Sequence, residues 1–168
     1  MYSVENNQRM AGFTLIETIV AVGVIMIGLV SALGAITTAL FYVSNIQNRL
    51  IAANLAAEGV EIVRNIRDNN WLQNLSWNSG LNDGNYQAAC QLASCNSISF
   101  SSYSGNPLLF DSASGLYNYA SGDNTSYTRK ISIANLSNYE IRVISDITWQ
   151  RRGIIFNISA EDHLFNWK

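Results

Sequence analysis

Few side chains in this sequence could carry out bond-making chemistry. The 168 residues include a single histidine, His163. A single imidazole gives little support for a Ser-His-Asp triad or for a histidine-based metal site. We therefore expect no enzyme, no catalytic residue, no metal site and no cofactor. For His163 we expect a solvent-facing or packing role.

The two cysteines offer a different chemistry. Four residues lie between Cys90 and Cys95, which is not the C-x-x-C spacing of a zinc knuckle or a thioredoxin-like site. If this part of the chain is exported, an oxidising compartment permits a disulfide between them. Closing so short a loop stabilises by about 2 kcal/mol, so the bond would mainly pin a local turn. Two free thiols are the alternative.

The carboxylate of Glu17 is the charge whose position demands an explanation. It is the single charged side chain between Phe13 and Val43, a stretch that exceeds the ~20 apolar residues needed to cross a bilayer as a helix. A carboxylate in such a segment costs on the order of 2.5–3.5 kcal/mol at mid-helix and less near an interface. Intramembrane carboxylates therefore usually have a partner. A carboxylate that reaches to water near the interface is the simpler alternative.

One long helix is predicted to position Glu17. Residues 13–44 are apolar on all sides, which indicates burial in lipid or among like helices. In residues 45–70 the apolar positions instead recur every three or four residues and form one stripe. No proline or loop cluster separates the two stretches, so we expect one helix from about Phe13 to about Asp68. Glu61 and Arg64 lie off the stripe and can pair.

The head, residues 71–168, is predicted to contain an antiparallel sheet. Short apolar runs within residues 71–126 suggest brief strands or ordered loops. Beyond them, apolar and polar residues alternate in three runs separated by turn-like segments, which predicts a three-stranded meander. A sheet with one apolar face needs a cover, and the amphipathic half of the helix is the candidate. The fold class is therefore α+β. Four aromatic residues are expected in the head core: Trp149, Phe156, Phe165 and Trp167.

The run Ala11-Gly12-Phe13-Thr14-Leu15-Ile16-Glu17 resembles the processing site of type IV prepilins and type II secretion pseudopilins. There a short polar leader ends in glycine, followed by an aromatic residue and an apolar helix, with a glutamate at the fifth position of the mature chain. The resemblance covers roughly Gly12 to Val43. It implies a leader at residues 1–12, cleavage by prepilin peptidase between Gly12 and Phe13, and methylation of the Phe13 amine. It also implies that Glu17 pairs with the Phe13 amine of a neighbouring subunit.

The same resemblance implies a pilin-like fold and a structural subunit of a type IV pilus or a secretion pseudopilus. The implied partners are other pilin or pseudopilin subunits, the peptidase, an inner-membrane assembly platform and the lipid bilayer. The implied location is the bacterial cytoplasmic membrane, with the N-terminus in the cytoplasm and the head outside, and then the filament. A looser resemblance of residues 20–36, 52–71 and 147–167 to minor pilins and pseudopilins favours a minor subunit.

Three other readings stay open. An ordinary secretory signal could be cleaved near Ala32-Leu33-Gly34, although helical periodicity continues past that point. A plain single-pass anchor explains the length and hydropathy but not the residues around Glu17. A pilus-tip binding module, such as an adhesin or a DNA-uptake pilin, would use the loops of residues 71–126. Because the net charge is −2 and Arg151-Arg152 stands at a predicted turn, we expect no nucleic-acid partner.

Overall fold

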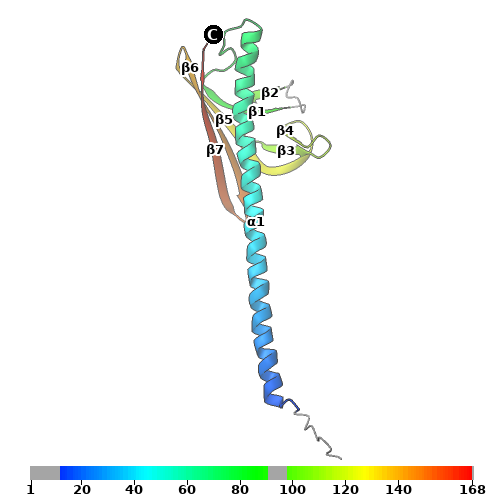
Figure 1. The fold of residues 1–168 in the computed structure, drawn as a ribbon. Coiled ribbons are helices and arrows are strands. Elements are labelled where there is room, and N and C mark those ends of the chain that lie inside the picture. Colours follow the sequence, from blue (N-terminus) through cyan, green and yellow to red (C-terminus); the bar gives the residue numbers. More distant parts are fainter. Residues whose placement is uncertain (1–11, 91–97, 168) are drawn as a thin grey trace, which may run out of the picture. The chain divides into compact units, whose positions relative to one another are not determined.

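The computed structural model describes residues 12–90 and 98–167 (Figure 1). In these residues one helix precedes a seven-stranded antiparallel sheet, which confirms the predicted α+β class. The chain divides into two compact units, Met1–Ile46 and Gln47–Lys168. The helix α1 contributes residues to both. The elements are α1 (Leu15–Leu72), β1 (Gly84–Cys90), β2 (Ile98–Ser102), β3 (Pro107–Asp111), β4 (Leu116–Asn118), β5 (Asp123–Ser137), β6 (Glu140–Arg151) and β7 (Ile154–Phe165).

The helix α1 ends four residues beyond the predicted stop at Asp68. The N–H of Asn74 donates to the Trp71 carbonyl at 3.1 Å, and that of Leu75 donates to the Asn70 carbonyl at 2.8 Å. Asn74 itself has a φ of 55°. This pair of bonds around a left-handed residue is the Schellman motif, which satisfies the last carbonyls of a helix. The Asn74 cap therefore ends the helix, and the earlier asparagines do not.

The sheet is built around β5. From Thr128 to Ser137 it pairs with β6, and β7 adds to the far side of β6. Along its other edge β5 pairs first with β3, up to Thr128, and then with β1, from Ile131. The strands β2 and β4 complete the order β2-β1-β5-β3-β4. The three-stranded meander predicted from alternation is confirmed as β5–β7, and the short apolar runs form β2, β3 and β4, whereas β1 was not predicted.

The predicted cover over the sheet is confirmed. Two core clusters join buried side chains of the second half of α1 to buried side chains of the sheet. Gly59 lies at the tightest point, because a Cβ there would overlap the Ser145 hydroxyl on β6. The residues that α1 contributes to the two clusters are Ala52, Leu55, Ala56, Val60, Ile62 and Val63.

The four aromatic residues expected in the core divide into two pairs. Trp149 is buried and stacks on Phe156, with ring centroids 5.4 Å apart. Phe165 and Trp167, by contrast, are 49% and 68% exposed, so that part of the prediction is wrong. The rings of Trp167 and Trp71 pack edge to face, with their centroids 4.6 Å apart. Phe165 and Trp167 fall at the end of β7 and just beyond it.

An arginine is buried between α1 and the sheet. Arg129 on β5 has no exposed side-chain surface, and its Nη2 donates to the Glu58 carboxylate at 3.2 Å. Among the described residues, neither Nε nor Nη1 of Arg129 has a hydrogen-bond partner. The Glu58 side chain keeps 32% of its surface exposed. The guanidinium therefore depends on Glu58 for its charge compensation, while the carboxylate also has access to water.

This asymmetry predicts unequal costs for removing the two partners. Glu58→Ala leaves a buried cation unpaired and should lower the free energy of unfolding by about 3 kcal/mol or more. Arg129→Met replaces the cation with an apolar side chain and should leave that free energy unchanged or raise it. Denaturant unfolding of the full chain in detergent, followed by tryptophan fluorescence, measures both.

Glu61→Ala is the matched control. Glu61 lies on the same helix in an exposed ion pair. Removing its carboxylate should lower the free energy of unfolding by less than about 1 kcal/mol. Equal destabilisation by Glu58→Ala and Arg129→Met would contradict the conclusion that the buried Arg129 cation depends on Glu58.

Candidate processing and assembly site

The predicted cleavage point lies in exposed, non-helical backbone just before α1. Gly12 and Phe13 have no regular secondary structure, and Phe13 is 80% exposed. No atom lies within 4 Å of the position that a Cβ on Gly12 would occupy. A protease could therefore reach the Gly12–Phe13 peptide bond without unfolding any of the described structure. The role of these two residues stays a prediction.

Thr14 caps the start of α1. The N–H of Glu17 donates to the Thr14 carbonyl at 3.1 Å and to the Thr14 Oγ1 at 3.3 Å. Thr14 followed three residues later by Glu17 is the capping-box pattern, which satisfies free N–H groups at a helix start. The acidic residue in the first turn also complements the positive end of the helix dipole. Glu17 thus has a local reason to stand at this end of the helix.

That local role leaves the Glu17 carboxylate without a charged partner. Within residues 12–90 and 98–167, no ion pair involves Glu17. Phe13 lies four residues earlier, just before the helix begins. The described chain therefore places a carboxylate and the predicted new amino terminus close together and supplies no other cation for the acid.

The first unit presents an apolar surface around the helix. Among the described residues, α1 is the one helix long and apolar enough to cross a membrane. Its hydroxyl groups are satisfied within the helix: Ser31 donates to the Ile27 carbonyl at 2.8 Å, and Thr37 and Thr38 both donate to the Gly34 carbonyl at 2.9 Å. Such bonds remove the cost of placing a free hydroxyl in lipid. The apolar length and these bonds indicate membrane anchoring.

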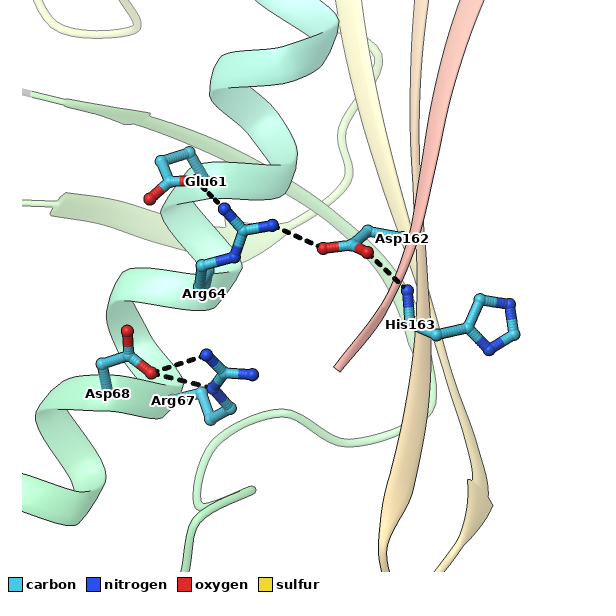
Figure 2. Close-up of polar contacts among 6 residues, drawn as sticks. All are labelled: Glu61, Arg64, Arg67, Asp68, Asp162 and His163. Atoms are coloured by element: carbon cyan, nitrogen blue, oxygen red, sulfur yellow. Dashed lines mark hydrogen bonds and ion pairs between the residues drawn. The ribbon is translucent and has the colours of Figure 1, made fainter. Parts of the chain in front are cut away.

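A polar network ties α1 to β7 in the second unit (Figure 2). Arg64 pairs with Glu61 at 2.5 Å, as predicted, and also with Asp162 on β7 at 2.6 Å. The hydrogen bond to Asp162 is the main reason that the pKa of Arg64 is raised. Asp162 also accepts the backbone N–H of His163 at 2.9 Å. The Arg64–Asp162 pair joins residues far apart in sequence, so local spacing gave no signal for it.

His163 is held between two carboxylates on the outer face of the sheet. Its Nδ1 lies 2.6 Å from Glu140 Oε1 on β6, and its Nε2 lies 3.4 Å from Glu161 Oε1. The hydrogen bond with Glu140 is the main cause of a raised pKa for His163. In the described part of the chain no group of three or more His, Cys, Asp or Glu could hold a metal ion. His163 is thus solvent-facing and hydrogen-bonded to Glu140.

The cysteine pairing stays a prediction. Cys90 ends β1, is 9% exposed and has no free thiol. Cys95 lies outside the described residues.

Comparison with known proteins identifies the N-terminal segment. Residues 7–33 match the prokaryotic N-terminal methylation motif. The match includes Gly12, Phe13 and Glu17 and does not extend to the head. Neither a curated protein nor a solved structure matches the chain. The motif supports a type IV pilin or pseudopilin, processed by prepilin peptidase and assembled with other pilin subunits.

The His163 contacts predict a pH dependence of stability. Because the pKa of His163 in the folded chain is raised above 6.5, the folded state holds the proton more tightly. The stabilisation is fully present below pH 6.5 and is lost as the pH rises through the raised pKa. Thermal unfolding of the full chain in detergent should therefore show a melting temperature that falls across this interval.

His163→Gln removes the titrating group and should abolish that fall, and Glu140→Gln should weaken it. An identical pH profile for the wild type and His163→Gln would exclude His163 as its source.

Proposed function

From the premise that the chain carries the N-terminal motif of type IV pilins and pseudopilins, we propose that it is a minor structural subunit of a type IV pilus or a type II secretion pseudopilus. The match at residues 7–33, together with an exposed Gly12–Phe13 peptide before a capped apolar helix, carries this proposal. Prepilin peptidase removes residues 1–12 and methylates the amine of Phe13. No bound cofactor is needed.

The first half of α1 holds the processed subunit in the cytoplasmic membrane, with the head outside. At the assembly platform the helices of neighbouring subunits pack side by side. The Glu17 carboxylate then pairs with the Phe13 amine of the adjacent subunit. The absence of any charged partner for Glu17 among the described residues supports this step. A cation from outside the chain offsets the cost of a carboxylate in an apolar environment.

A second candidate is a binding module at a filament tip. A cavity of about 290 Å³ lies at the point where β5 changes its pairing from β3 to β1. Burial raises the pKa of Tyr119 to about 12, so its hydroxyl keeps its proton at neutral pH. Amides, a phenol and apolar groups suit a neutral polyhydroxylated ligand, and a glycan screen with the full chain would separate this role from pure assembly. The lining residues are Gln87, Asn106, Pro107, Leu109, Tyr119 and Asn124.

Processing can be tested by mass spectrometry of the N-terminus. In cells with an active prepilin peptidase, the chain should begin at Phe13 and carry one methyl group. Gly12→Val should block cleavage, because a β-branched residue restricts the backbone that glycine leaves free to extend into the protease. Ala11→Val, one residue earlier, is the control and should still be processed. A wild-type chain that begins at Met1 would falsify the proposal.

Assembly can be tested at Glu17. Glu17→Ala and Glu17→Gln should each lower the fraction of the chain found in sheared filaments about tenfold or more, since a bond between charged groups contributes about 1.5–3 kcal/mol. Membrane insertion should persist, because an apolar helix without a carboxylate enters lipid more readily. Immunoblots of the filament and membrane fractions give both quantities.

Thr18→Ala alters the adjacent position without changing charge and should assemble normally. Full incorporation of Glu17→Ala would show that the charge pair does not drive assembly.

A further inference from the structure

The last strand, β7, forms a long margin of the sheet. All twelve of its residues pair with β6 without a register shift, and no other described strand pairs with it. The strands at the other margins are short, with five residues in β2 and three in β4. A strand that pairs on one side only presents a row of backbone N–H and C=O groups on its other side. We call this row, along residues 154–165, the open edge.

The open edge lacks the features that commonly protect the margin of a sheet. Proteins shorten such strands, interrupt them with a bulge, or place proline or lysine on them. The strand β7 contains neither proline nor lysine, and its pairing with β6 is regular. Residues 154–160 carry no charge and include three isoleucines and one phenylalanine. Because β-branched and aromatic side chains favour the extended conformation, this stretch is suited to accept a further strand.

The two faces of β7 differ, which determines how the side chains of an added strand would lie. Phe156 and Ile158 pack against a core cluster between the sheet and α1. Asn157 and Ser159, which alternate with them, are exposed. Directly opposite residues on neighbouring strands lie on the same face of a sheet. An added strand therefore fits best with apolar side chains beside Phe156 and Ile158 and neutral polar side chains beside Asn157 and Ser159.

The later part of the open edge is acidic. Asp162 pairs with Arg64 on α1. The side chain of Glu161 is 50% exposed, and in the described part of the chain the one group within ion-pair distance of it is Nε2 of His163, at 3.4 Å. Neither lysine nor arginine occurs in β7. A lysine or arginine on an added strand, opposite Glu161, would supply the cation that β7 itself lacks, and such cross-strand pairs are stabilising.

We propose that the open edge binds an extended segment of another polypeptide, which joins the sheet as an eighth strand. The backbone of this segment pairs with residues 154–161. Its uncharged side chains lie beside residues 154–160, and a basic side chain lies opposite Glu161. Backbone pairing of this kind provides affinity, and the side chains provide specificity. The interaction goes beyond the proposed function, because it requires neither processing nor filament assembly.

A second copy of this chain matches the open edge less well. Each β7 contributes the carboxylates of Glu161 and Asp162 and no lysine or arginine. Pairing of two β7 strands would bring four carboxylates to one interface without a basic side chain to compensate them. Like charges on paired strands are destabilising, so a different strand with a basic residue is the better occupant.

Binding of a synthetic strand to the full chain in detergent tests the proposal. The probe is the acetylated and amidated peptide Lys-Val-Thr-Val-Thr-Val-Thr-Val. In antiparallel pairing its lysine lies opposite Glu161, and its valines lie on the face of Phe156 and Ile158. Fluorescence anisotropy of the labelled peptide gives its affinity, and hydrogen exchange followed by NMR shows which amides become protected. We expect slower exchange at alternate amides of residues 154–161 and no change in β2 or β4.

Two N-methylated forms of the peptide separate backbone pairing from apolar adhesion. Successive amides of a strand point to opposite edges, so methyl groups on the valine amides and on the threonine amides block different edges of the peptide. One form should bind at least about tenfold more weakly than the unmodified peptide, because several hydrogen bonds are lost together, whereas the other should retain its affinity. Equal affinities of the two methylated forms would overturn the proposal.

A charge exchange at position 161 tests the register. Glu161→Lys should weaken binding of the lysine peptide up to about fivefold and strengthen binding of a peptide with glutamate in place of lysine by a similar factor. Asp123→Lys, at an exposed residue of β5, makes the same change in net charge and should leave the preference for the lysine peptide unchanged.

Three results would contradict the proposal while leaving anchoring and processing intact. These are failure of the lysine peptide to bind, an unchanged peptide preference in Glu161→Lys, and protection of β7 amides at high protein concentration without peptide. The last result would assign the open edge to a second copy of the chain.

Discussion

The packing of one helix face onto the sheet is the interaction on which the rest of the head depends. The residues that α1 contributes at the tightest contact are small, and at Gly59 the helix approaches β6 so closely that a Cβ would overlap Ser145. Close approach of this kind increases van der Waals contact over the whole interface. The sheet has no other cover among the described residues, so the head cannot be separated from the second half of the helix. The same helix therefore builds the head and supplies the anchor.

This double role explains how the helix distributes its side chains. Up to Val43 it is apolar all round, which suits lipid or neighbouring helices. In the head, one stripe meets the sheet, and two charged side chains beside it reach the strands. Glu58 compensates Arg129 on β5, and Arg64 pairs with Asp162 on β7. The two pairs fix the helix against different strands of one sheet.

Glu17 differs from these charges because the described chain offers it no partner. In an apolar segment, a lone carboxylate has a large free-energy cost unless a cation is nearby. A cation supplied by a second molecule converts that cost into a driving force for association.

Local periodicity allowed the sequence alone to determine the apolar helix, its amphipathic continuation, the alternating strands β5–β7 and the Glu61–Arg64 pair. The motif around Glu17 is local in the same sense. Only the tertiary structure decided the rest. The strand β1 has too few large apolar residues to be recognised before it pairs with β5, and the helix continues to Leu72 because Asn74 can adopt a left-handed conformation. Arg129 lies at an inward-facing position of β5, between the inward-facing Tyr127 and Ile131. This alternation along the strand was the signal in the sequence that could have predicted its burial. The alternation shows on which face of the strand a residue lies, but not which element covers that face. The cover depends on residues that are distant in sequence.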